Sequence, residues 1–104
     1  MSDRFGLPEE SIAKICNIFS QYPQIENIVL YGSRAKGNYR PGSDIDLSIL
    51  AENLTLSDLL AIENQIDDLL LPWSVDLSLL HKIDNPALVE HINRVGVPFC
   101  NRFF

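Results

Sequence analysis

The sequence predicts a small α/β domain with a mixed sheet of three to four strands and flanking helices on at least one face. Two observations carry this prediction. Amphipathic runs at helical spacing alternate with short apolar runs of strand type, and turn residues separate the two kinds of run. The chain has 104 residues, which is enough for one modest core, so we expect residues 1–104 to form a single domain.

The amino-terminal half begins with a helix signal. Pro8 followed by Glu9 and Glu10 predicts a helix start, because proline suits the first turn and acidic side chains stabilise its positive end. An apolar face follows at helical spacing, formed by Ile12, Ile15, Cys16 and Phe19. We then expect a short strand over residues 28–31, a single helical turn over residues 33–38 and a second strand over residues 44–50.

The carboxyl-terminal half repeats this alternation. Thr55, with Asp58 three residues later, matches a capping box and predicts the start of the next helix. Its buried stripe is expected to consist of Leu59, Ile62, Ile66, Leu69 and Leu70. Residues 75–80 are expected to form a third strand, and Asn85-Pro86 opens a last helix that Gly96 stops.

Charge and cysteine content exclude several classes of function. The chain has eight Lys and Arg residues against fourteen acidic ones, a net charge of -6, which disfavours binding along DNA or RNA. It has no apolar run approaching the roughly 20 residues that span a bilayer, so no membrane association is expected. Cys16 and Cys100 are too few and too unpatterned for a disulfide framework, and we expect a reducing, cytoplasmic location.

Three aspartates are predicted to share one face of the sheet. Asp44 and Asp46 point the same way from the second strand, about 6.5–7 Å apart along the chain. Residues 46–50 (DLSIL) resemble residues 76–80 (DLSLL). If the helix between these strands crosses over, the strands run parallel as neighbours, and Asp76 then lies beside Asp46.

Placing like charges together is unfavourable. Two carboxylates about 6.5 Å apart repel by roughly 2–3 kcal/mol at an effective dielectric near 20. Divalent cations relieve this repulsion, and Mg²⁺ prefers one or two carboxylates together with water and phosphate oxygens. The alternative is an ordinary solvated strand face, on which aspartates at alternate positions have no ligand.

Gly32 and Ser33 follow the first strand directly. Backbone amides at such a turn suit an anion, glycine allows close approach, and the serine hydroxyl is a further donor. Arg34, Lys36 and Arg40 follow in the same loop, although the chain is acidic overall. The alternative is a plain turn closed by glycine. A phosphate-binding turn ahead of metal-binding aspartates would serve a nucleoside triphosphate.

Taken together, Gly-Ser, ten residues, Asp-x-Asp and a third aspartate on a later strand resemble the nucleotidyltransferase superfamily that includes DNA polymerase β. The likeness is greater still to the minimal nucleotidyltransferases (MNT proteins), including MntA-like antitoxins of HEPN/MNT pairs. It covers essentially the whole chain: GLPEE in the first helix, the YGSRAKG turn, PGSDIDL and the VDL strand.

The resemblance implies a role for each matching residue. Gly32 and Ser33 would hold the triphosphate of ATP, with Arg34 a further phosphate contact or else a solvent-facing residue. Asp44 and Asp46 would coordinate two Mg²⁺ ions. Asp76 would help to hold one metal and assist deprotonation of the attacking hydroxyl. The activity implied is transfer of a nucleoside monophosphate, AMP by preference, to an acceptor.

The resemblance also implies a partner. MNT proteins are commonly encoded beside a helical HEPN protein that resembles an RNase, which they neutralise by transferring AMP to a tyrosine or by binding. We therefore expect a protein acceptor and a homo- or hetero-oligomer. Two alternatives stay open: a non-catalytic module that neutralises its partner by complex formation, and a small-molecule transferase of the aminoglycoside type that needs a dimer or partner to complete its pocket.

Other residues receive more modest interpretations. His81 and His91 are expected to be surface residues, because neither has a second metal ligand nearby in sequence. Trp73 is expected to pack, with base stacking as the alternative. The three phenylalanines of the tail, Phe99, Phe103 and Phe104, are expected either to pack against the sheet or to face a partner.

Overall fold

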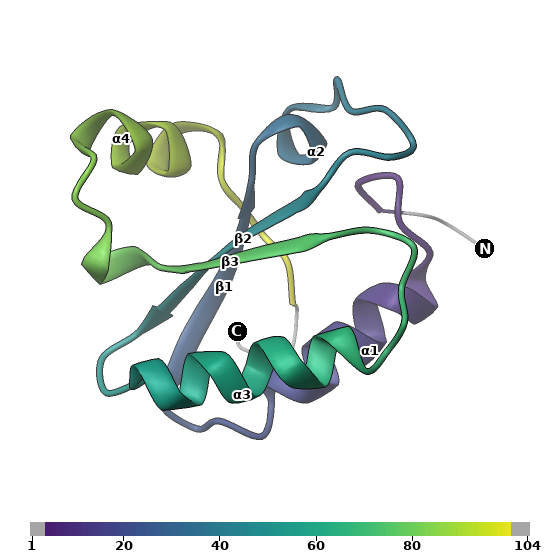
Figure 1. The fold of residues 1–104 in the computed structure, drawn as a ribbon. Coiled ribbons are helices and arrows are strands. Elements are labelled where there is room, and N and C mark those ends of the chain that lie inside the picture. The colour runs from purple at the N-terminus through teal and green to yellow at the C-terminus, as the bar shows by residue number, and fades with distance from the viewer. Residues whose placement is uncertain (1–3, 101–104) are drawn as a thin grey trace.

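The alternating apolar and amphipathic runs form a mixed sheet with helices on both sides (Figure 1). The structure is a computed structural model, and it describes residues 4–100. In chain order its elements are α1 (Glu9–Phe19), β1 (Ile25–Tyr31), α2 (Ser33–Lys36), β2 (Ile45–Ala51), α3 (Leu56–Asp67), β3 (Val75–Leu79), a 3-10 turn (Leu80–Lys82), α4 (Pro86–Val95) and β4 (Val97–Pro98).

The four strands lie in the order β3-β2-β1-β4. Strands β1 and β2 are antiparallel, whereas β2 and β3 are parallel because α3 crosses over between them. Strand β4 pairs antiparallel with β1. Helices α1 and α3 lie together on one side of the sheet and α4 lies on the other (Figure 1). The predicted crossover, and with it the parallel pairing of the two Asp-Leu-Ser strands, is confirmed.

The hydrophobic core lies between the sheet and helices α1 and α3. Ile45, Leu47 and Ile49 of β2 are fully buried, which confirms the predicted inward face of that strand. From the helices the core takes, among others, Ile12, Ile15 and Phe19 of α1 and Ile62 and Ile66 of α3. Because side chains alternate along a strand, Asp46 and Asp76 lie on the opposite face, away from this core.

Local signals in the sequence set the helix starts. The Thr55 hydroxyl accepts from the amide of Asp58, and the Asp58 carboxylate accepts from the amide of Thr55, which completes the predicted capping box. Asn85 caps α4 by accepting from the amides of Ala87 and Leu88. Each cap satisfies amides that would otherwise lack partners at the start of a helix.

Several expectations about the elements differ from the structure. Strand β1 begins at Ile25 rather than at Ile28, and the short β4 was not predicted as a strand. Leu70 is not part of the buried stripe of α3. That helix ends at Asp67, and Leu70 lies beyond it in a left-handed conformation (φ 55°), with 87% of its surface exposed. Helical spacing no longer decides where a side chain points once the helix has ended.

The structure contains a disulfide that the cysteine count and spacing did not predict. Cys16 and Cys100 form a disulfide between α1 and the residue two positions after β4, 84 residues apart in sequence. Their proximity depends on the pairing of β4 with β1, which returns the chain to α1, and no local signal reveals it.

The start of the tail packs as expected, since Phe99 is fully buried; Phe103 and Phe104 lie outside the described residues. Within residues 4–100, no helix is both long enough and apolar enough to cross a membrane.

Candidate active site

Strand pairing brings two of the three predicted carboxylates, those of Asp46 and Asp76, onto one face. Asp46 of β2 is the register partner of Asp76 of β3, and Asp44 lies two residues before Asp46, just ahead of the strand. Asp46 is half-buried, whereas Asp44 and Asp76 are exposed. Neighbouring strands lie about 4.8 Å apart, so Asp46 and Asp76 sit side by side across the ladder.

We call Asp44, Asp46 and Asp76 the carboxylate row. Its electrostatics centre on Asp46. Burial raises the pKa of its carboxyl above the ordinary value, and the nearby charges of Asp76 and then Asp44 raise it further. His91 acts in the opposite direction and lowers this pKa. The carboxylates therefore repel one another, as the sequence predicts, and a cation placed among them would relieve that repulsion.

Gly32 packs directly against this row. Its backbone adopts φ 77° and ψ -157°, a conformation that side chains with a Cβ rarely adopt. A Cβ at this position would also collide with Oδ2 of Asp46. The backbone of Gly32 therefore lies directly against the Asp46 carboxylate. Only glycine allows both this backbone conformation and this close approach.

Beyond Gly32 the chain makes one helical turn, α2. The carbonyl oxygens of Gly32 and Ser33 accept from Lys36, Gly37 and Asn38, and Gly37 ends the turn in a left-handed conformation. No acceptor among residues 4–100 bonds to the amides of Ser33 and Ala35. These donors and the Ser33 hydroxyl stand at the end of β1, next to the glycine that contacts Asp46.

Arg34 has a different role from the one predicted. Its side chain is only 2% exposed, and its guanidinium donates to the carbonyl oxygens of Phe5, Pro41 and Ser43 at 2.9–3.2 Å. It also lies over the ring of Tyr39. Burial lowers the pKa of this guanidinium, although arginine stays charged. The structure does not support the expected phosphate contact, because carbonyl groups of the protein occupy its donors.

Two residues near the carboxylates were not predicted to lie there. Tyr31 is the register partner of Asp46 across β1 and β2, and its ring makes a T-shaped contact with the His91 ring of α4, with 6.2 Å between centroids. Burial raises the pKa of the Tyr31 phenol, the nearby Ser78 side chain acts against this, and the charges of Asp46 and Asp76 raise it further. The place of Tyr31 beside Gly32 could have marked it, but nothing local marks His91, which is partly exposed.

Other predicted residues lie apart from the row or support its loop. The Trp73 indole N–H donates to the carbonyl oxygen of Pro41 at 3.0 Å, so this side chain packs against the loop that precedes Asp44. His81 is exposed, as expected. The repeated serines also meet, since the Ser78 hydroxyl donates to that of buried Ser48 at 3.3 Å.

The donor set fits a hard divalent cation in part. Within residues 4–100, no group of three or more His, Cys, Asp or Glu side chains is gathered closely enough to hold a metal ion by itself. The strand register nevertheless places the carboxyl groups of Asp46 and Asp76 side by side, with Asp44 two residues upstream. Mg²⁺ needs only one or two carboxylates and completes its shell with water and phosphate oxygens, so a nucleotide could supply the remaining ligands.

A turn with free amides, set against carboxylates on neighbouring strands of this mixed sheet, defines a nucleotidyltransferase domain. The chain belongs to the polymerase beta nucleotidyltransferase family, whose model, "Polymerase beta, Nucleotidyltransferase", matches residues 13–102. The resemblance noted in the sequence is therefore confirmed, and the protein is a nucleotidyltransferase by family.

Relatives and solved structures agree with this assignment. The chain is 32% identical over 85 residues to the "Putative protein adenylyltransferase MJ1217" of Methanocaldococcus jannaschii, covering 81% of this chain and 86% of the relative. It superposes on a toxin–antitoxin structure with AMP-PNP at a TM-score of 0.69 and 25% identity, covering 90% of this chain and 73% of the other. A structure described as a "putative minimal nucleotidyltransferase" gives 0.67 and 27%, with 86% and 93% covered.

Proposed function

We propose that this domain transfers AMP from ATP to a side chain of a protein partner. The observation that carries the proposal is the contact between Gly32 and Asp46, because it joins the phosphate-binding turn to the carboxylate row. The relative named as a protein adenylyltransferase and the neighbour with AMP-PNP support the choice of adenosine nucleotide and of a protein acceptor.

In this proposal the chain's own residues bind and orient the nucleotide. The amides of Ser33 and Ala35 and the Ser33 hydroxyl donate to phosphate oxygens, and Gly32 lets the phosphates approach the backbone closely. Asp44, Asp46 and Asp76 would hold Mg²⁺, two ions by analogy with the family. When bound, Mg²⁺ supplies charge neutralisation for the triphosphate and lowers the pKa of the attacking hydroxyl.

The reaction is a substitution at the α-phosphorus. The acceptor oxygen forms a bond to this phosphorus, the bond to the bridging oxygen breaks, and pyrophosphate leaves. The acceptor's proton passes to the carboxylate of Asp76, which is exposed and beside Asp46. Neither Asp44 nor Asp46 needs to accept a proton in this scheme.

The acceptor we propose is a helical protein of the HEPN type, with this chain as its antitoxin. The toxin–antitoxin neighbour supports this pairing. The net charge of -6 favours a protein acceptor over a nucleic acid. The two proteins would form a hetero-oligomer in which the partner brings its acceptor hydroxyl to the open side of the row.

Transfer of label from α-labelled ATP to the co-expressed partner tests the proposal directly. We expect transfer that requires Mg²⁺ and that Asp46→Asn slows by at least about 100-fold. Asp68→Asn makes the same chemical change at the end of α3 and serves as the control. Transfer by Asp46→Asn at the wild-type rate would rule out the mechanism.

An assay of the partner's toxicity in cells distinguishes neutralisation by AMP transfer from neutralisation by binding alone. If AMP transfer is the means of neutralisation, Asp44→Asn and Asp46→Asn should fail to protect cells, although both variants still bind the partner. Equal protection by the wild type and both variants would show that complex formation alone neutralises the partner.

A further inference from the structure

A groove separates helix α3 from strand β3 on the side of the sheet opposite the carboxylate row. We call it the α3–β3 groove; it has a volume of about 290 Å³ and is lined by Glu63, Asn64, Ile66, Asp67, Val75 and Leu77. A second hollow of about 410 Å³ shares Ile66, Asp67 and Val75 with it and continues toward Trp73. The groove is therefore an extended channel along the strand rather than a closed cavity.

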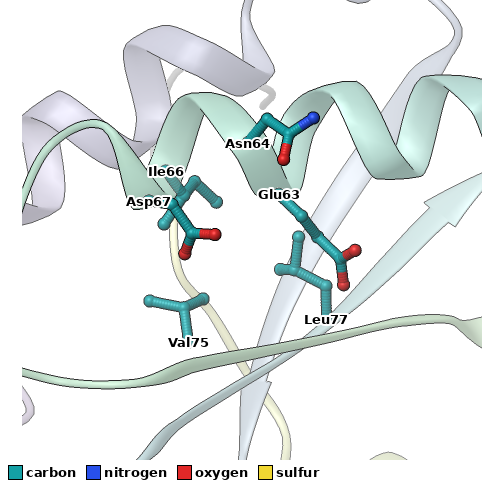
Figure 2. Close-up of a pocket in the computed structure, with 6 residues that line it drawn as sticks. All are labelled: Glu63, Asn64, Ile66, Asp67, Val75 and Leu77. Carbon is teal, nitrogen blue, oxygen red and sulfur yellow. The ribbon is translucent and has the colours of Figure 1, made fainter.

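The lining of the α3–β3 groove has two kinds of surface. Ile66, Val75 and Leu77 form an apolar floor (Figure 2). Figure 2 shows the carboxylates of Glu63 and Asp67 reaching from α3 toward β3, above Leu77 and Val75. Within residues 4–100, neither carboxylate forms an ion pair with a Lys, Arg or His side chain. A ligand with an apolar stem and a cationic end complements this lining.

Strand β3 is also an open edge of the sheet. The amide of Ile45 donates to the carbonyl oxygen of Ser74, so the backbone of Ser74, and by alternation that of Asp76 and Ser78, faces β2. The backbone groups of Val75 and Leu77 therefore face outward. Among residues 4–100 no backbone or side-chain group bonds to them. Such an edge is a template for pairing with another extended segment.

We infer that the outer edge of β3 and the α3–β3 groove together bind an extended segment of a partner protein with Lys or Arg at alternate positions. The segment would add a fifth strand beside β3, and its backbone would pair with Val75 and Leu77. Its basic side chains would lie along the groove floor and reach Glu63 and Asp67. A second copy of this chain fits poorly, because its net charge of -6 opposes the acidic rim.

This inference does not depend on AMP transfer, because the groove and the carboxylate row lie on opposite faces. A suitable probe is a blocked eight-residue peptide of alternating lysine and valine, titrated into the full-length, isotope-labelled protein. We expect NMR shifts at the amides of Val75 and Leu77 and exchange of these amides slowed about tenfold at saturation. Two control peptides should fail to bind: glutamate in place of lysine, and alternating D- and L-residues of the original composition.

Two charge-matched double variants distinguish binding of the peptide in the α3–β3 groove from its non-specific attraction to an acidic protein. The double variant Glu63→Gln/Asp67→Asn should raise the Kd of the lysine–valine peptide about three- to tenfold. Glu26→Gln/Glu52→Gln removes the same charge from exposed positions outside the groove and should leave the Kd unchanged. Thermal unfolding checks that both double variants stay folded.

Four outcomes would overturn the inference: no shift at Val75 and Leu77, equal weakening by both double variants, equal binding of the D,L-peptide, or protection of these two amides in the concentrated free protein. The last result would mean that a second copy occupies the edge.

Discussion

Gly32 is the residue at which backbone conformation and site chemistry meet. The φ of 77° and ψ of -157° at this position lie in a region that is essentially restricted to glycine, and the collision of an added Cβ with Asp46 Oδ2 is a separate obstacle. The two effects can be separated, because Gly37 also has a positive φ (86°) and open space around its Cα. Gly37, at ψ 4° in the left-handed helical region, thus tests a positive φ in the same turn without the collision.

Gly32→Ala should therefore lose both stability and activity. We expect a loss of about 1–2 kcal/mol in the free energy of unfolding from the backbone conformation. We also expect a loss of most AMP transfer, because the Asp46 carboxylate must move. Gly37→Ala should lose about 1–2 kcal/mol for its left-handed helical conformation, with transfer retained. Denaturant unfolding and the label-transfer assay measure the two effects. Retained transfer in Gly32→Ala would show that the close approach of Gly32 to Asp46 does not matter for activity.

The raised pKa of Asp46 predicts how stability depends on pH. A carboxyl group with a raised pKa in the folded state is destabilising when ionised, so its cost is absent below the unfolded pKa of about 3.9. The cost appears as the pH rises from that value through the raised folded pKa. Asp46→Asn should therefore be more stable than the wild type at pH 7 without Mg²⁺, and this gain should vanish at low pH.

Magnesium supplies a second check on the same residue. Mg²⁺ should stabilise the wild type by binding its folded state, and Asp46→Asn should gain less. Thermal unfolding of both proteins, with Asp68→Asn as the control, measures these differences. A wild type that is more stable than Asp46→Asn at pH 7 without Mg²⁺ would contradict the proposed repulsion.

At the residue scale, the sequence correctly predicts those neighbours in the site that short motifs specify. The Gly-Ser pair and the repeated Asp-Leu-Ser pattern indicate which residues gather, because strand alternation and a crossover helix place Asp76 beside Asp46. Tyr31 and His91 were missed as neighbours of the row because their contact depends on how α4 packs over β1. Arg34 was misassigned because a basic residue in a turn looks the same whether it faces solvent or carbonyl groups.

At the scale of elements, Arg34 holds three chain segments together. Its guanidinium joins α2 to the amino-terminal segment at Phe5 and to the loop at Pro41 and Ser43, which leads into Asp44. The position of α2 relative to β2 therefore depends on a side chain that does not face the proposed nucleotide. Arg34 is a positioning residue for the turn and for the start of β2.

Arg34→Lys keeps the charge but removes the forked donor geometry. We expect a loss of about 2–3 kcal/mol in the free energy of unfolding and a rise of roughly tenfold in the KM for ATP, with a smaller change in kcat. Arg40→Lys, at an exposed position in the same loop, should change neither quantity. Steady-state kinetics and denaturant unfolding provide both values, and an unchanged KM would remove Arg34 from the positioning role.

Helices were easier to predict than strand ends. Thr55 and Asn85 act through neighbouring amides, so their caps can be read from a few residues. Strand β4 contains only Val97–Pro98 and exists because β1 offers it an edge, a condition that no window of sequence contains. Leu70 shows the same limit at a helix end, where one left-handed residue redirects the chain.

For the whole molecule, the Cys16–Cys100 disulfide closes a loop that contains most of the chain. With the cysteines 84 positions apart in sequence, the chain-entropy model predicts a contribution of about 4–5 kcal/mol to the free energy of unfolding. Full reduction should therefore lower the Tm by more than about 10 °C. Cys16→Ala/Cys100→Ala should be insensitive to the reductant. Two free thiols per chain in the oxidised protein would contradict the pairing.

A strand added beside the edge strand β3 would present side chains to both faces of the sheet, and this has a consequence for the choice of acceptor. Neighbouring side chains on an added strand point in opposite directions, so those flanking a lysine that enters the α3–β3 groove turn toward the face with Asp76. Any hydroxyl delivered by such a strand would then stand an odd number of positions from the lysine. Acceptor sequences would therefore have an odd spacing between the lysine and the modified residue. Shifting the hydroxyl by a single residue would abolish its modification.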